Sequence, residues 1–138
     1  MSAGELVMHP VGYVESPIKE LVDAPLQGDE GETEAWIQLT EADQRAGSDL
    51  RPGDRVVLLT WLHAASRDVL AVHPRGDRTR PAAGVFSTRS EDRPNPIGLH
   101  EVEVLSVERG RLLVRPLEAI DGTPVVDIKP VLAPVNRR

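Results

Sequence analysis

The sequence contains no cysteine among its 138 residues. Disulfide bonds, thiolate metal ligands and cysteine nucleophiles are therefore excluded, and a reducing cytoplasm is the natural setting. No stretch approaches the roughly 20 consecutive apolar residues that a membrane helix needs. The opening stretch MSAGELVMHPVGYVESP carries acids and a proline where a secretory signal has a basic flank and an apolar run. These absences predict a soluble, cytoplasmic protein with no membrane partner.

The common signatures of several enzyme classes are also missing. No GxGxxG opens a helix after a strand and no GxxxxGK[ST] is present, which disfavours a classical dinucleotide fold and a P-loop. No GxSxG supports an activated serine. The four histidines show no HExxH or other compact metal spacing, so no metal is expected. His63 stands out among them because it ends the apolar run VVLLTWLH, where a core strand reaches the surface.

Length predicts one domain, residues 1–138, with one core. The formal net charge is −6, and the acids are concentrated in the first third of the chain. Whole-chain charge argues against broad nucleic-acid binding. Between His73 and Arg93 the balance reverses, because five arginines face three acids (Arg75, Arg78, Arg80, Arg89 and Arg93 against Asp77, Glu91 and Asp92). An anionic ligand and a simple solvated loop both fit this run.

Short apolar and β-branched runs between glycine and proline punctuation predict a mainly β protein. The predicted strands are Leu6–Val14, Thr33–Leu39, Arg55–Leu62, Ala83–Ser87, Leu99–Glu108, Arg111–Leu117 and Val125–Ile128. Two short helices are predicted at Thr40–Ala46, with Thr40 as N-cap, and at Ser66–Ala71. With no βαβ rhythm, the pattern indicates an antiparallel sheet curled into a small barrel or a sandwich.

Three turns divide these strands. Alternating residues on both sides of Glu108-Arg109-Gly110-Arg111 predict a β-hairpin. RPGD at 51–54 and DGTP at 121–124 predict turns that feed the next strands.

The segment RPNPIG, from Arg93 to Gly98, holds two prolines around one asparagine. Pro94 and Pro96 fix their own φ angles and push the preceding residues toward extended backbone, so the amide of Asn95 is presented from a stiff chain. Arg89 and Arg93 can pair with a carboxylate or phosphate. A proline-rich turn that only joins two strands is the simpler alternative.

A second polar pattern lies in DGTPVVDIKP, where Asp127 and Lys129 share a face if the segment is a strand. As an exposed salt bridge the pair contributes about 0–1 kcal/mol. In a partly desolvated pocket it can position a substrate and hold Asp127 ionised as a proton acceptor.

The two segments GVFSTRSEDRPNPIGLH and DGTPVVDIKP, in this order, closely resemble the signature segments of the TrmO family, also called TsaA-like or VirR-like. VGYVESPIKE, APLQG and LLTWLH are weaker matches, so the resemblance covers nearly the whole chain. It implies a small β-barrel S-adenosylmethionine-dependent methyltransferase that works as a homodimer, with cofactor sites near the subunit interface. The best-known activity of the family is N6-methylation of N6-threonylcarbamoyladenosine beside the anticodon of tRNA.

The resemblance also implies site residues. The implied cofactor contacts are Gln27, Leu62, His63, Arg89, Leu99, Arg115, Pro116, Leu117 and Glu118. Arg93, Asn95 and Pro96 are implied to line the substrate side, and Asp127, Asn95 and Lys129 to serve catalysis.

This chain departs from the family pattern at two places. VESPIKE has Glu15 and Ile18 where the family commonly has an arginine and an aromatic residue, and Lys129-Pro130-Val131 replaces a KPY ending. By the same comparison, we expect the chain to be a single domain without the C-terminal extension of longer bacterial members. Two alternatives therefore stay open: a methyltransferase of a small-molecule acceptor, and a cofactor-binding β-barrel without catalysis.

Overall fold

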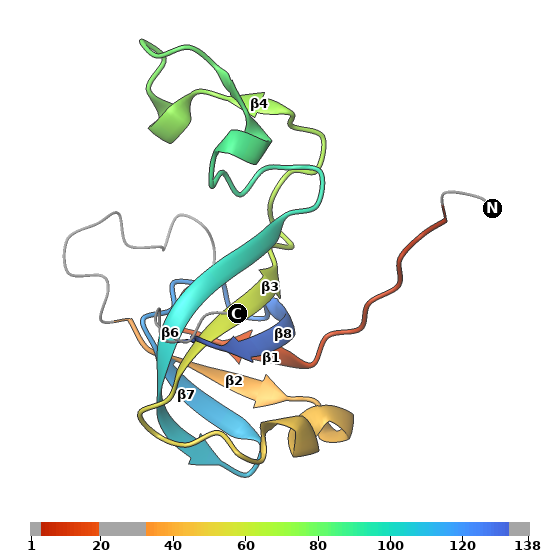
Figure 1. Ribbon diagram of the computed structural model, residues 1–138, viewed down its shortest axis with the longest axis vertical. Helices are drawn as coiled ribbons and strands as arrows, with labels where there is room; N and C mark the ends of the chain where they lie inside the picture. Colours follow the sequence, from red (N-terminus) through yellow and green to blue (C-terminus); the bar gives the residue numbers. More distant parts are fainter. Residues whose placement is uncertain (1–3, 20–32, 133–138) are drawn as a thin grey trace.

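The computed structural model describes residues 4–19 and 33–132, and Figure 1 shows a small barrel from which one arm projects. Six strands close the barrel in the order β1-β2-β7-β6-β3-β8. Their bounds are β1 Gly12–Glu15, β2 Ala35–Leu39, β3 Arg55–Trp61, β6 Ile97–Glu108, β7 Arg111–Arg115 and β8 Pro124–Pro130. Every neighbouring pair is antiparallel. The prediction of a small antiparallel β-barrel is confirmed.

The barrel core is aliphatic. Valine, leucine, isoleucine and alanine side chains from all six strands fill it, and Ile37, Leu58, Val102, Val104 and Val114 are completely buried. The aromatic residues stay outside it: Tyr13 and Phe86 are exposed, and Trp36 and Trp61 are half-buried. β-Branched and leucine side chains on alternate strand positions suit a narrow barrel interior, because they pack in defined rotamers.

The arm consists of the chain between the end of β3 and the start of β6, which Figure 1 shows extending from one end of the barrel. It contains a two-stranded sheet, β4 Ala71–Val72 with β5 Ala83–Gly84. Two single-turn 3₁₀-helices, η4 Pro74–Gly76 and η5 Val85–Ser87, shape its loops. The predicted strand Ala83–Ser87 is thus a two-residue strand that turns into a helix, and β4 was not predicted.

One of the two predicted helices is present. A 3₁₀-helix, η3 Glu41–Gly47, follows Thr40 as N-cap, and the Thr40 hydroxyl donates to the carboxylate of Asp43. The predicted helix at Ser66–Ala71 is wrong. The backbone N–H of Ser66 donates to Asp92 Oδ1 at 2.8 Å, and its carbonyl accepts from Arg93 N at 3.0 Å, so long-range contacts replace a local helical ladder.

The predicted first strand is also shorter than expected. It covers Gly12–Glu15, and residues 4–10 are extended without pairing to any described strand. Leu6 and Val7 are almost completely exposed (97% and 92%). Within the described residues, no helix is long and apolar enough to cross a membrane.

All three predicted turns are present. In the β6–β7 hairpin Glu108 pairs with Arg111, and both turn residues, Arg109 and Gly110, have positive φ. This conformation is the type that matches the twist of the flanking strands. Gly53 and Gly122 supply the positive φ in the other two turns.

Candidate functional site

The RPNPIG segment is the point where the arm returns to the barrel. The carbonyl of Pro96 accepts from Leu62 N at 2.7 Å, which joins the outgoing and returning chains at the base of the arm. Pro96 is buried, and Asn95 between the two prolines is exposed. The prolines therefore stiffen a junction, and the asparagine side chain lies at its surface, as the sequence predicted.

Arg93 organises the loop that precedes this junction. Its guanidinium donates to the backbone carbonyls of Val85, Thr88 and Ser90 at 2.8–3.0 Å. A planar guanidinium has five N–H donors and can join several carbonyls at once, which an ammonium cannot do with the same geometry. In this structure Arg93 holds the loop that carries Phe86 and Arg89, and its role as a substrate contact stays a prediction.

Gly98 leaves room for a polar pair inside the barrel. Thr60 Oγ1 and His100 Nε2 lie 3.0 Å apart, on neighbouring strands β3 and β6. A Cβ at position 98 would overlap Thr60 Oγ1 and lie 2.8 Å from His100 Nε2. Thr60 is completely buried, and burial lowers the pKa of His100 from its ordinary value of 6.5. His100 is therefore neutral at pH 7.

His100 of this pair also lines a pocket of about 40 Å³, here called the barrel-mouth pocket. It is lined by Leu62, His63, Ala64, Ala65, Glu91, His100, Glu118, Ala119, Ile120 and Thr123. The lining combines apolar side chains with two carboxylates and two imidazoles. Three of the predicted cofactor contacts come together here: the adjacent residues Leu62 and His63, and Glu118, which is 55 positions further along the chain. Sequence reasoning missed His100, whose only signal was its place directly after RPNPIGL.

The other predicted cofactor contacts lie elsewhere. Leu117 is a core residue, 1% exposed, so only its backbone is within reach of a ligand. Arg115 lies at the end of β7, 3.9 Å from Glu34, and is followed by Pro116. Gln27 lies outside the described residues.

Asp127 and Lys129 lie on the outer face of β8. They form the predicted salt bridge, with Lys129 Nζ 3.4 Å from Asp127 Oδ2, and both side chains are at least half exposed. A β-bulge at Val126 sets this orientation, because Leu59 pairs with Asp127 while Thr60 pairs with Val125. The extra residue turns Val125 into the core and the Asp127 carboxylate outward.

Next to this pair lies an apolar surface, the outer apolar face, in which half-buried Val57, Leu59 and Trp61 of β3 adjoin exposed Ile97 and Leu99 of β6. Leu59 pairs with Leu99 on one side and Asp127 on the other, so all three share one row of the sheet. Leu99 is 53% and Ile97 is 44% exposed. The predicted contacts Leu99 and Asp127 are thus neighbours on the outside of the barrel, apart from the barrel-mouth pocket.

Arg89 lies in a third place, a groove of about 1110 Å³ on the arm, here called the arm groove. Two segments line it: Val72–Gly76 with Arg78 and Arg80, and Phe86–Ser90. The structure therefore brings together four of the five arginines that the sequence singled out, while Arg93 is directed into the neighbouring loop.

Among the described residues there is no group of three or more histidines and carboxylates close enough to hold a metal ion. The expectation that the protein uses no metal stays a prediction.

Comparison with known sequences finds one protein family and relatives that share one kind of name. The family model of the tRNA-methyltransferase O N-terminal domain matches residues 13–136. A probable S-adenosyl-L-methionine-binding protein of Methanothermobacter thermautotrophicus is 47% identical over 131 residues, 94% of this chain and 93% of the relative. The S-adenosyl-L-methionine-binding protein of Archaeoglobus fulgidus is 44% identical, covering 90% and 88%. The probable S-adenosyl-L-methionine-binding protein VirR of Rhizobium radiobacter is 35% identical, covering 97% and 79%.

Solved structures agree with the sequence relatives. The crystal structure of TrmO from Pseudomonas aeruginosa superimposes with a TM-score of 0.72 at 29% identity and covers 98% of this chain. A second TrmO crystal structure gives a TM-score of 0.75 at 30% identity. This chain spans only 62% and 63% of the length of those two proteins.

Proposed function

The chain belongs to the tRNA-methyltransferase O N-terminal domain family, and from this membership we propose that it is an S-adenosyl-L-methionine-dependent methyltransferase that acts on tRNA. The observation that carries the proposal is the match over residues 13–136, together with a barrel that superimposes on TrmO. The relatives named for S-adenosyl-L-methionine binding support the cofactor. Within this class, the proposed acceptor is the N6 nitrogen of N6-threonylcarbamoyladenosine.

The chemistry of the barrel-mouth pocket fits part of this cofactor. Apolar side chains such as Leu62 and Ile120 suit an adenine ring, and the carboxylates of Glu91 and Glu118 suit hydroxyl and cationic groups. Pockets that enclose small ligands measure about 300–1,000 Å³. A space of about 40 Å³ in one protomer holds only a fragment of such a molecule. The complete site therefore needs further chain, and Gln27, Arg89, Leu99 and residues 115–117 remain proposed contacts.

A second copy of the chain is the partner that we propose to complete the site. The outer apolar face exposes Ile97 and Leu99 beside the predicted catalytic pair, and exposed apolar patches rimmed by polar residues are typical of protein interfaces. Burying this face in a homodimer would partly desolvate Asp127 and Lys129 and unite residues that are separated within one protomer. The implied position of the cofactor near a subunit interface agrees with this arrangement.

When bound, S-adenosyl-L-methionine supplies a methyl group on a sulfonium. In the transfer the carbon–sulfur bond breaks, a carbon–nitrogen bond forms to N6, and the nitrogen loses a proton. Most of the rate of such a transfer comes from bringing donor and acceptor into line. We assign this positioning to the stiff Pro94-Asn95-Pro96 junction, with the Asn95 amide facing the substrate. Asp127 is the proposed proton acceptor, and Lys129 Nζ lies 3.4 Å from its Oδ2.

One observation keeps a small-molecule acceptor as the second candidate. Glu15, which stands where the family commonly has an arginine, pairs with Arg111 at 2.9 Å. Ile18, which stands where the family commonly has an aromatic residue, is buried, at 4% exposure. The side chains at these two positions therefore contact this chain itself, and neither offers the basic or aromatic contact to RNA that the family pattern would provide. This candidate predicts methyl transfer without any RNA.

The deciding experiment is transfer of labelled methyl from S-adenosyl-L-methionine to total tRNA from a strain that lacks its own activity, followed by nucleoside mass spectrometry. A gain of one methyl on threonylcarbamoyladenosine is expected. Cofactor binding with no transfer to RNA, but transfer to small molecules of a cell extract, would replace the tRNA proposal with the second candidate. Cofactor binding with no methylated product at all would indicate a non-catalytic binding protein.

A further inference from the structure

The arm groove concentrates positive charge on an acidic protein. Arg75, Arg78, Arg80 and Arg89 line it together with His73, and no acidic side chain is part of the lining. All four arginines are exposed, and none forms an ion pair with another residue of the described part of the chain. Their charges are therefore available to an external anion, while the whole chain carries −6.

Asp77 is the acidic residue of the loop from His73 to Arg80, and its carboxylate accepts hydrogen bonds from within that loop. Asp77 Oδ1 accepts hydrogen bonds from the backbone N–H of Thr79 at 2.9 Å and from its hydroxyl at 2.5 Å. Both bonds lower the pKa of Asp77, and the bond from the hydroxyl has the larger effect. His73 Nδ1 lies 2.9 Å from the carbonyl oxygen of Arg80, so it donates to that oxygen and closes the loop at its base. Local contacts thus fix the loop without using the arginine side chains.

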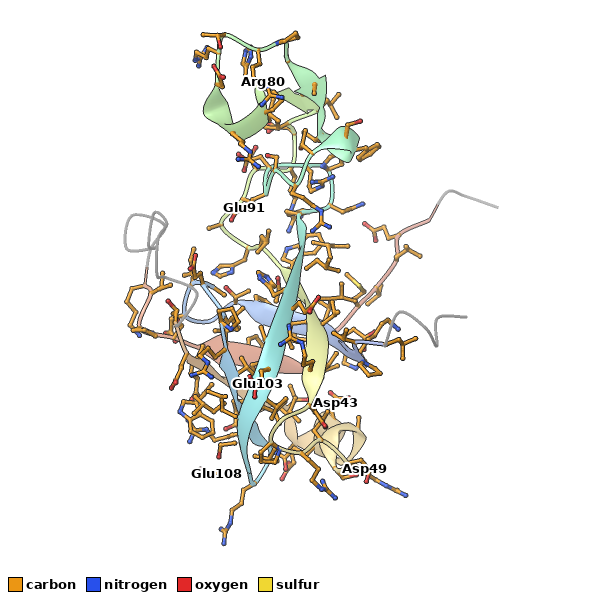
Figure 2. The ribbon with its side chains drawn as sticks, turned by 60° about the vertical axis from the view of Figure 1, so that its left-hand side comes forward. Asp43, Asp49, Arg80, Glu91, Glu103 and Glu108 are labelled. Carbon is orange, nitrogen blue, oxygen red and sulfur yellow. The ribbon has the colours of Figure 1, made fainter. Side chains whose placement is uncertain are left out.

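The acidic residues labelled in Figure 2 lie away from the tip of the arm. Figure 2 shows Arg80 at the far end of the arm, Glu91 near the base of the arm, and Asp43, Asp49, Glu103 and Glu108 on the barrel. Exposed arginines (Arg45, Arg51 and Arg109) accompany the acids of the barrel, whereas the arm groove has arginines and no acid in its lining. A polyanion is therefore attracted to the arm groove.

The only phenylalanine of the sequence also lines the arm groove. Phe86 is 84% exposed, although burying a side chain of this kind contributes about 1.5–3 kcal/mol. Arg93 fixes the loop that carries Phe86 through the carbonyls of Val85, Thr88 and Ser90. An exposed ring on a fixed loop beside cationic side chains is the combination that binds single-stranded nucleic acid, where bases stack on aromatic faces and phosphates meet arginines.

We propose that the arm groove binds the sugar-phosphate backbone of a single-stranded RNA segment, with Arg75, Arg78 and Arg80 at phosphates and Phe86 stacked on a base. The proposal rests on the proposed function for its choice of RNA. A strand fits better than a free nucleotide, because the arm groove and the barrel-mouth pocket have no lining residue in common and a polymer can contact both. The arm then holds tRNA while its modified base enters the site on the barrel.

The test compares two variants that change charge equally. The arm variant carries Arg75→Gln, Arg78→Gln and Arg80→Gln, and leaves out Arg89 because it is a proposed cofactor contact. The control variant carries Arg45→Gln, Arg51→Gln and Arg109→Gln, all exposed on η3 and on turns of the barrel. Binding of a fluorescently labelled tRNA transcript is measured by anisotropy from low to moderate salt, and S-adenosyl-L-methionine binding by calorimetry.

For the arm variant we expect tRNA binding at least about tenfold weaker than wild type at low salt, and a plot of log K against log salt that is shallower by about 2. This value corresponds to three phosphate contacts at about 0.7 each for single-stranded RNA. The control variant keeps the wild-type slope. Both variants keep the wild-type affinity for S-adenosyl-L-methionine. An arm variant whose slope and affinity equal those of the control overturns the proposal.

A third variant, Phe86→Ala, separates stacking from charge. It is expected to weaken tRNA binding by about 5- to 150-fold while leaving the salt slope unchanged. Equal affinity for wild type and Phe86→Ala removes the stacking contact. AMP is titrated in parallel, and AMP binding that depends on the three arginines while tRNA binding does not would assign the groove to a free nucleotide.

These results are independent of the methyl-transfer assay. If wild type methylates tRNA but the arm variant binds it like wild type, the arm proposal fails and the proposed function stands. If wild type transfers no methyl to tRNA and does not bind it, both fail together.

Discussion

Replacing Gly98 with alanine tests the role of the packed polar pair at the mouth of the barrel. The added Cβ would overlap Thr60 Oγ1, and it would lie 2.8 Å from His100 Nε2 and 3.0 Å from Leu62 Cδ2. Overpacking of this kind costs about 1–3 kcal/mol, and the upper half of that range is expected because Thr60 is completely buried and its strand pairs with a neighbour on each side at this residue. With an unfolding entropy of about 0.29 kcal/mol/K for 138 residues, the melting temperature should fall by about 7–10 °C.

The assay is urea unfolding followed by circular dichroism, with Gly84→Ala as the matched control. A Cβ at position 84 meets only the carbonyl oxygen of Leu70, at 3.9 Å, so the control should stay within about 0.5 kcal/mol of wild type. In a Thr60→Ala background the cost of Gly98→Ala should fall by at least about 1 kcal/mol, because the overlapping atom is gone. A Gly98→Ala protein as stable as the control, or an equal cost in both backgrounds, would refute this account of the glycine.

Three further predictions concern ionisable side chains. Because burial lowers the pKa of His100, the unfolded chain binds a proton more readily than the folded one, so stability should fall as pH drops below about 6.5, and His100→Gln should flatten this part of a stability-against-pH curve. Asp127→Asn should reduce kcat for methyl transfer by about 10²-fold or more at saturating substrates while changing the free energy of unfolding by less than about 1 kcal/mol; unchanged turnover would remove Asp127 as the base. Arg93→Lys should raise amide hydrogen exchange at residues 85–90 by about 10- to 100-fold with little effect on exchange in β3, because one ammonium cannot replace the bonds to three carbonyls.

The barrel strands could be predicted from the sequence because their signals are local. The β6–β7 hairpin follows from alternating apolar residues around a turn with glycine, and the strand that became β3 follows from a continuous apolar run between RPGD and His63. Alternation with period two within one strand decides which of its residues face the core, whichever strands pair with it. The order of strands around the barrel has no such local signal, and the choice of a closed barrel over a sandwich came only from the family resemblance.

The arm could not be predicted, because long-range hydrogen bonds determine it. The residues from Ser66 to Ala71 have a plausible helical composition, yet both backbone groups of Ser66 bond to the returning chain at Asp92 and Arg93. Val85 continues an apparent strand, yet its carbonyl accepts from Arg93 and the chain turns into η5. Contacts between residues this far apart in sequence override local preference.

The residues predicted for the site lie in separate groups in the structure. Leu62, His63 and Glu118 do meet in one pocket, and Asp127 does pair with Lys129. Leu99 faces outward and Arg89 lies on the arm, so among the described residues the predicted contacts fall into separate places on one protomer. A resemblance in motifs transfers residue identities, but it does not say which subunit supplies each residue. The proposed homodimer would unite them.

The segment from Arg93 to His100 connects all three of these places. Arg93 fixes the loop that carries Arg89 and Phe86, Leu99 belongs to the outer apolar face, and His100 forms the floor of the barrel-mouth pocket. Pro94 and Pro96 restrict the backbone between the arm loop that carries Phe86 and the two places on the barrel. If the proposed RNA site on the arm holds, this stiff junction would present the strand to the barrel at a fixed distance and orientation, as a transfer that depends on alignment more than on covalent chemistry requires. Lengthening or loosening this junction should therefore reduce turnover more than it reduces the affinity for either tRNA or S-adenosyl-L-methionine alone.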